Sequence, residues 1–193
     1  MPGGNIIQPD QRRLAEAGAL LVVDFQEKLL PAIDGAEALL ENTLRLARGA
    51  GLLGVPTFAT EQYPRGLGPT VNPLASLIPD RPAKTTFHAL GAPGIVEGLR
   101  RLGVRHVTLA GIEAHVCVAQ TALELLQLGY AVQVAADAVG SRFAVDREFA
   151  LRRLERAGAV VTTTEAILFE WIGDAADPRF KAFTALIKER TRG

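Results

Sequence analysis

The chain has 193 residues, and about 100 to 200 residues per domain is usual, so we expect a single domain spanning residues 1–193. Hydrophobic residues make up 48% and charged residues 22%, which is typical of a packed globular protein and excludes a disordered chain. The 21 Lys and Arg residues balance the 21 Asp and Glu residues and form no basic cluster. We therefore expect neither nucleic acid nor a membrane surface as a partner.

Cysteine usage and the absence of targeting patterns predict the compartment. The single cysteine excludes an internal disulfide, and no basic stretch is followed by an apolar leader. No apolar run approaches the roughly 18 residues that cross a bilayer. We expect a cytoplasmic protein.

Short aliphatic strands alternate with amphipathic helices along the chain. The pattern predicts strands at residues 19–25, 55–60, 106–112, 131–136 and 159–163. It predicts helices at residues 36–50, 95–102, 116–128, 143–157, 165–171 and 179–188. Such alternation is typical of a three-layer, doubly wound (Rossmann-like) α/β fold with a parallel sheet.

The segment at residues 62–82 has no regular pattern. It contains five of the eleven prolines and the glycines Gly66 and Gly68. A loop of this length inside a compact domain is usually functional, so we expect a lid or binding wall, with a mobile linker as the alternative.

Polar residues follow several of the predicted strands. Asp24 ends the first strand, Glu61 to Tyr63 follow the second, Lys84 comes next, and Cys117 opens the helix after residues 106–112. Because ligands of open α/β sheets bind at the carboxyl ends of the strands, Asp24, Lys84 and Cys117 are candidates for one site. Singly, each has a structural alternative: a helix or turn cap, a surface lysine and an inert core thiol.

The position of Cys117 favours a nucleophile. A helix N-terminus and a nearby lysine both lower a thiol pKa, which would provide a thiolate near neutral pH. An acceptor such as Asp24 could take the thiol proton.

The sequence resembles the isochorismatase-like cysteine hydrolases over roughly residues 19–166. Five segments carry the resemblance, namely Val-Val-Asp-Phe-Gln at 22–26, Thr-Glu-Gln-Tyr-Pro-Arg-Gly-Leu-Gly at 60–68, Lys-Thr-Thr-Phe at 84–87, Gly-Ile-Glu-Ala-His-Val-Cys-Val at 111–118 and Asp-Ala-Val-Gly-Ser-Arg at 137–142. The second segment looks most like the branch of isochorismatase domain-containing proteins.

The resemblance implies a six-stranded parallel sheet of order 3-2-1-4-5-6 and a catalytic triad of Asp24, Lys84 and Cys117. It also implies a cis peptide at Ile112–Glu113 and an oxyanion hole formed by the backbone N–H groups of Glu113 and Cys117.

Two departures from family patterns bear on the chemistry. Nicotinamidases of this superfamily hold a metal with an Asp-Trp-His segment, which is replaced here by Glu61, Gln62 and Tyr63. We therefore predict no catalytic metal and no cofactor. We interpret His88, His106 and His115 as surface or hydrogen-bonding residues, with His115 the first candidate for an exception because it is two residues from Cys117. Isochorismatases themselves lack the cysteine, so Cys117 favours acyl transfer from an amide-like substrate. Four further residues are candidates for the substrate pocket: Gln26, Gln62, Tyr63 and His115.

The leading hypothesis is a cofactor-independent hydrolase that cleaves a small amide-like C–N bond through a thioester on Cys117. The alternative is a catalytically silent binding or scaffold protein, because the neighbouring Glu113 carboxylate would disfavour a thiolate. A thiol that titrates well above pH 8 would favour the scaffold. A homo-oligomer is expected from the apolar helix at 116–128 and from apolar residues near the end of the chain, which are Phe169, Trp171, Phe180 and Phe183. The alternative is that these residues belong to the core, and the sequence does not separate the two.

Overall fold

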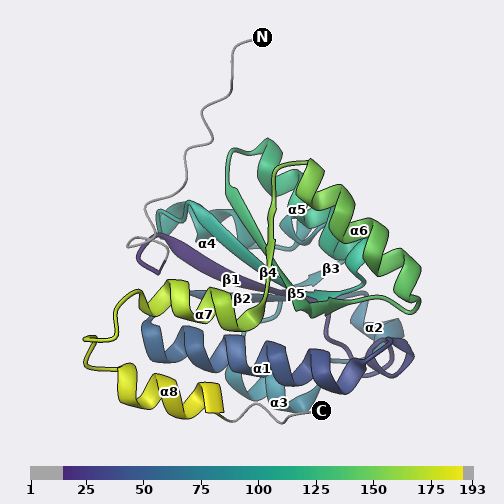
Figure 1. Cartoon of the computed structure of the whole chain (residues 1–193). Helices are drawn as coiled ribbons and strands as arrows, with labels where there is room; N and C mark the ends of the chain where they lie inside the picture. Colours follow the sequence, from purple (N-terminus) through teal and green to yellow (C-terminus); the bar gives the residue numbers. More distant parts are fainter. Residues whose placement is uncertain (1–14, 189–193) are drawn as a thin grey trace.

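A computed structural model describes residues 15–188. Its six-stranded parallel sheet has the order β3-β2-β1-β4-β5-β6, which confirms the predicted topology. The strands are β1 (Gly18–Val23), β2 (Thr57–Gln62), β3 (Ala83–Lys84), β4 (His106–Ile112), β5 (Ala131–Gly140) and β6 (Val160–Thr162). Figure 1 shows the sheet between two layers of helices.

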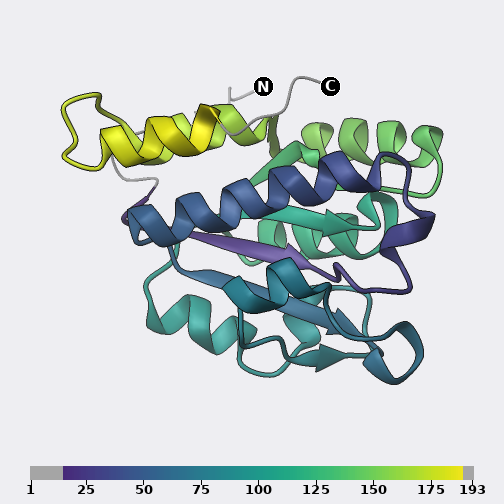
Figure 2. The same cartoon turned by 90° about the horizontal axis from the view of Figure 1, so that it is seen from below.

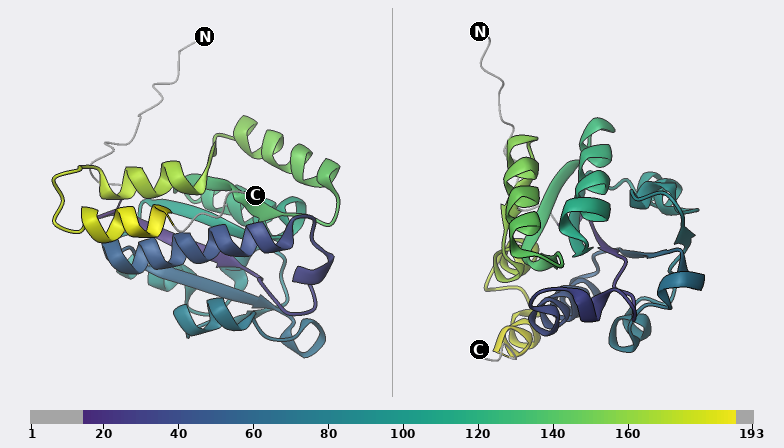
Figure 3. Two further views of the ribbon diagram at one scale, coloured as in Figure 1. Left: turned by 60° about the horizontal axis from the view of Figure 1, so that its bottom comes forward. Right: turned by 90° about the vertical axis from the view of Figure 1, so that its right-hand side faces the viewer.

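The aliphatic run in β1 is buried on both faces. Leu20 and Val22 belong to the core under one helical layer, whereas Leu21 and Val23 belong to the core under the other. This is the arrangement that a central strand of a parallel sheet requires, since helices cover both of its faces. Figures 2 and 3 show the two layers from below and from the side.

Helices α1 and α7 pack on one face of the sheet with α8 against α1, and α4, α5 and α6 pack on the other face. The helices are α1 (Ala36–Leu53), α2 (Pro64–Leu67), α3 (Asn72–Leu77), α4 (Ile95–Arg101), α5 (Ala119–Gln127), α6 (Ala144–Arg156), α7 (Thr164–Ile172) and α8 (Phe180–Lys188). Helix α1 continues through Gly51 and ends where Gly54 adopts a left-handed conformation, with φ of 77°.

The structure corrects the description of two segments. Residues 62–82 are not irregular throughout, because they contain α2 and α3, each with a proline in its first turn. Strand β5 extends to Gly140, four residues beyond the prediction, because a bulge opposite Leu109 and Gly111 lets pairing with β4 resume. The longer strand carries Ser141 and Arg142 to the carboxyl edge of the sheet.

Most of the apolar residues predicted to mediate association are part of the core. Helix α5 buries Ala122 and Leu125, and both Trp171 and Phe183 are buried under the sheet. Phe169 remains 44% exposed, with its ring edge-on to Phe183. None of the helices within residues 15–188 is long and apolar enough to span a membrane.

Candidate active site

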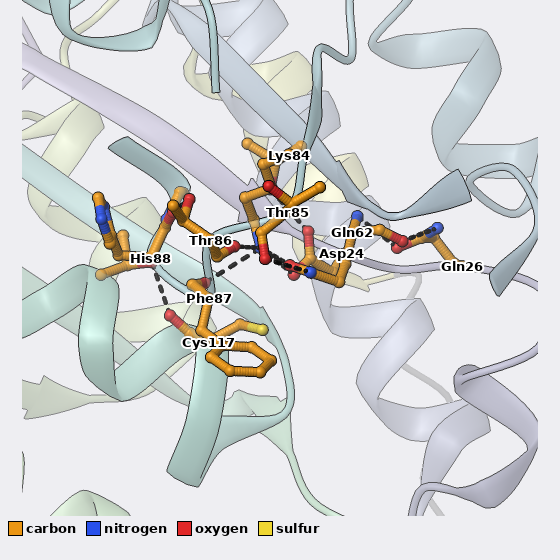
Figure 4. A network of polar contacts seen from close by, with 12 residues as sticks. Asp24, Gln26, Gln62, Lys84, Thr85, Thr86, Phe87, His88 and Cys117 are labelled. Atoms are coloured by element: carbon orange, nitrogen blue, oxygen red, sulfur yellow. Dashed lines mark hydrogen bonds and ion pairs between the residues drawn. The ribbon is translucent and has the colours of Figure 1, made fainter. Parts of the chain in front are cut away.

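Asp24, Lys84 and Cys117 meet at the carboxyl edge of the sheet. Asp24 follows β1 with φ of 57°, Lys84 ends β3, and Cys117 lies in a π-helix (Ala114–Val118) between β4 and α5. Lys84 Nζ is 2.8 Å from Asp24 Oδ2, and both side chains are fully buried. The Cys117 thiol is close enough to both partners for their charges to act on its pKa. Figure 4 shows the three side chains converging from separate elements.

Four oxygen atoms surround the Lys84 ammonium. Besides Asp24, Nζ donates to Gln62 Oε1 at 2.6 Å and to the backbone carbonyls of Thr86 and Phe87 at 3.2 and 3.0 Å. An ammonium has three protons, so these oxygens occupy all of its donors. Lys84 is therefore arranged to hold its neighbours in place electrostatically, with no proton left to donate to a further group.

The loop that supplies two of these carbonyls is held by close packing. Thr86 Oγ1 donates to the carbonyl of His88, and a Cβ atom at Gly91 would collide with the same hydroxyl oxygen. The missing side chain at Gly91 leaves the space that Thr86 occupies. From this position the Thr86 carbonyl accepts a hydrogen bond from Lys84 Nζ.

Gln26 and Gln62 connect Lys84 to the loop after β2. Gln26 Nε2 donates to the carbonyls of Gln62 and Gly68, and Gln26 Oε1 accepts from the Gln62 N–H at 2.7 Å. Gln62 Nε2 donates to the Thr85 carbonyl at 3.0 Å, which turns its oxygen toward Lys84. Gln26 is completely buried. It therefore holds the loop through internal contacts, and its expected place in the substrate pocket stays a prediction.

The electrostatics of the thiol differ from the expectation. Burial, followed by the negative charge of Asp24, raises the pKa of Cys117 to about 12, and Lys84 opposes this shift without overcoming it. The expected lowering of the pKa was wrong, because a helix terminus and one paired lysine do not offset the desolvation of a buried thiolate. Burial also raises the pKa of Asp24, against the opposing effects of Lys84 and of the Thr60 hydroxyl that donates to Oδ1.

The segment before Cys117 has an unusual backbone. The peptide bond between Ile112 and Glu113 is cis, and Gly111 has φ of 148°. A Cβ atom at Gly111 would collide with the carbonyl oxygen of Val23. Only glycine allows β4 to approach β1 this closely, immediately before Asp24 on one strand and before the cis peptide on the other.

The charged neighbours of Cys117 have their own partners. Glu113 Oε2 accepts from the backbone N–H and from Nε of Arg142, at 3.1 and 3.0 Å. His115 Nδ1 lies 3.0 Å from Ser141 Oγ. Sequence reasoning did not foresee that Ser141 and Arg142 form this border of the site, although both stand in a segment that carried the family resemblance.

The positions that match the nicotinamidase metal segment are occupied differently here. Glu61 Oε1 accepts from Thr70 N–H and Oγ1 and from Arg81 Nε, so it fastens the segment at residues 62–82. Tyr63 is 56% exposed with φ of 37°, and its ring lies against Gly66. Within residues 15–188, no three His, Cys, Asp or Glu side chains are grouped so that they could hold a metal ion.

Comparisons with known proteins identify the class of this fold and site. The isochorismatase domain model matches residues 18–166. Isochorismatase domain-containing protein 1 of Salmo salar is 42% identical over 166 residues, which are 86% of this chain. The chain spans 59% of the length of that relative.

Two solved structures share the architecture. The MAR1 ribonuclease of Caenorhabditis elegans is 40% identical with a TM-score of 0.87, and the match covers 93% of each chain. The YcaC gene product of Escherichia coli, described as an octameric hydrolase of unknown specificity, is 26% identical with a TM-score of 0.77 over 92% of this chain and 96% of that one. The fold and the site define an isochorismatase-like α/β protein. The chain belongs to the isochorismatase family, whose hydrolase fold it has.

Proposed function

We propose that the protein is a cofactor-independent hydrolase that cleaves a small amide-like C–N bond through a thioester on Cys117. The observation that supports the proposal is the buried Asp24–Lys84 ion pair beside Cys117, whose thiol is under the electrostatic influence of both charges. A raised thiol pKa means that no thiolate waits in the resting site. The adjacent Asp24 carboxylate can instead act as a general base during the attack, so a preformed thiolate is not needed.

In the first half of the reaction, the Cys117 thiol gives its proton to Asp24 as the sulfur attacks the carbonyl carbon. The resulting oxyanion is stabilised by the backbone N–H groups of Glu113 and Cys117. When the C–N bond breaks, the Asp24 carboxyl returns the proton to the leaving nitrogen, and an acyl thioester remains on Cys117.

In the second half, water attacks the thioester carbon and gives a proton to Asp24. The C–S bond breaks, the acid is released, and the proton on Asp24 returns to the sulfur. Lys84 takes no part in these proton transfers, because its donors are held by four oxygens. The raised pKa of Asp24 makes that carboxylate a better proton acceptor than an exposed aspartate.

The test is a screen of small amides with intact-mass detection of an acyl adduct. A thioester predicts an adduct on Cys117 that hydroxylamine removes, and no adduct or turnover in Cys117→Ala. Leu128→Ala, a substitution at an exposed position, is the matched control and retains full turnover. Undiminished turnover in Cys117→Ala would refute the nucleophile.

A second candidate is a silent binding or scaffold protein, and the buried thiol with a pKa of about 12 favours it. A thiol that titrates well above pH 8 was expected to favour the scaffold. A high thiol pKa does not exclude catalysis here, however, because the Asp24 carboxylate beside the thiol can accept its proton during attack. If the protein forms no adduct with any amide of the screen and turns none of them over, the scaffold replaces the hydrolase as the proposed function.

Because the C. elegans relative is named a ribonuclease, the same screen also includes RNA as a substrate. The balanced charge of this chain and its cysteine site favour a small substrate over a polyanion. Degradation of RNA that is abolished in Cys117→Ala would replace the amide proposal.

We also propose that the chain forms a homo-oligomer. The octameric state described for the E. coli relative supports association within this fold. Sedimentation of the wild-type protein at micromolar concentration tests it directly.

A further inference from the structure

The most exposed large apolar side chains of the described structure are clustered at the start of α6. Phe143 and Phe149 are each 62% exposed and Val145 is 57% exposed. Val145 and Phe149 are four residues apart, so they lie on the same face of the helix. Figures 1 and 3 show α6 at the periphery of the fold. We call Phe143, Val145 and Phe149 the α6 patch.

The charges along α6 are divided between its two halves. Asp146 and Glu148 lie in the first half, and the exposed arginines Arg152, Arg153 and Arg156 lie in the second. Two copies of such a helix placed antiparallel would set each acidic half against the basic half of the other copy. A parallel arrangement would set like charges together.

Three other charged groups do not disturb this division. Arg147 points inward, where it donates to the carbonyls of Val139 and Ala136. Arg142, which precedes the patch, is engaged by Glu113. Glu155 is the one acid in the basic half, where it is outnumbered by three arginines.

We propose that α6 binds α6 of a second copy of this chain in an antiparallel arrangement, with Phe149 near the two-fold axis. Self-complementary charge is what an isologous interface requires, because each patch must match itself after rotation. Exposed phenylalanine and arginine side chains are typical anchors of such interfaces. The inference specifies the surface for the proposed homo-oligomer and does not depend on the proposed chemistry.

The contact would border the active site. Asp146 Oδ2 lies 4.0 Å from His115 Nε2, and His115 is two residues from Cys117. Arg142, bound to Glu113, stands directly before the patch. The partner helix would therefore form part of the rim of each site.

Sedimentation of charge-reversal variants tests the arrangement. Glu148→Arg and Arg152→Glu each place like charges across the two-fold axis, so each variant alone should associate at least about tenfold more weakly than the wild type. An equimolar mixture should form a heterodimer with wild-type affinity, because each substituted side chain then faces one of opposite charge on the other variant. The Glu148–Arg152 ion pair within each helix stays broken in the mixture, so restored association reports contact between chains.

Two further variants complete the experiment. Phe149→Glu should give a smaller species than the wild type, and Leu102→Glu, at an exposed apolar position before β4, should not change the association. Circular dichroism checks that each variant is folded. A monomeric wild type would refute the homo-oligomer itself. An oligomer that Phe149→Glu leaves intact, or a mixture that fails to associate, would refute the α6 surface alone.

Discussion

The thiol of Cys117 lies close to the ion pair of a buried carboxylate and a buried ammonium, in a site from which water is largely excluded. Burial and Asp24 raise its pKa to about 12, while Lys84 acts in the opposite direction. In the wild type, alkylation by iodoacetamide should therefore remain slow and show no plateau up to about pH 10. An ordinary thiol would show an inflection near its pKa of about 8.5. Such an inflection for Cys117 would contradict this electrostatic account.

Replacing Asp24 by Asn should change two rates in opposite directions. Loss of the negative charge lowers the thiol pKa, so alkylation of Cys117 at about pH 8 should rise about tenfold for each unit of pKa. Turnover should fall by about 10²- to 10⁴-fold, because the general base is missing. Asp34→Asn, which alters an exposed carboxylate, should leave both rates unchanged. Parallel changes in the two rates would show that Asp24 is not the base.

Replacing Gln62 by Glu should have the opposite electrostatic effect. Its side-chain oxygen is 2.6 Å from Lys84 Nζ, so a carboxylate there would pair with the ammonium and weaken its support of the thiolate. Alkylation at about pH 10 should slow by up to about tenfold. Gln62→Met, which has a similar length and no charge, should have little effect. If both variants slow equally, the effect comes from loop packing and not from charge.

At the scale of whole elements, the approach of β4 to β1 depends on one glycine. Gly111→Ala should lower the free energy of unfolding by about 2 to 4 kcal/mol, because its Cβ would meet the Val23 carbonyl at a positive φ. Gly51→Ala provides a matched control. It lies within α1 with open space around it, and should raise the free energy of unfolding by about 0.5 to 1 kcal/mol. Urea unfolding measures both changes, and equal effects would disprove the packing argument.

The elements around residues 62–82 show why a sequence pattern can mislead. Prolines made this segment look irregular, yet a proline in the first turn is compatible with a helix, as Pro64 and Pro73 show. Glu61, Thr70 and Arg81 then fasten the segment through side-chain contacts. Whether it closes over the site stays a prediction.

At the scale of the whole molecule, α8 completes the core on the face that α1 and α7 cover. Phe183 is fully buried, with its ring 5.0 Å from that of Phe169. Phe183→Ala should lower the free energy of unfolding by about 3 to 5 kcal/mol. Phe169→Ala, at a position that is 44% exposed, should cost clearly less. Thermal unfolding followed by circular dichroism measures both, and a negligible effect of Phe183→Ala would show that α8 is dispensable for the core.

The sequence by itself determined the alternation of strands and helices, because that signal is carried by neighbouring residues. The resemblance added the strand order, and the strand-end positions of Asp24, Lys84 and Cys117 predicted that they would meet. Their meeting is a consequence of parallel topology, which brings the carboxyl ends of all strands to one edge.

Only the tertiary structure decided the surroundings of the thiol, the contacts of Gln26 and the exposure of α6. Each of these depends on how much water surrounds a group and on the distances between residues far apart in the chain. A pattern that places Cys117 at a helix N-terminus suggests a lowered pKa, whereas the packed site raises it. Desolvation is a property of the whole core and has no local sequence signal.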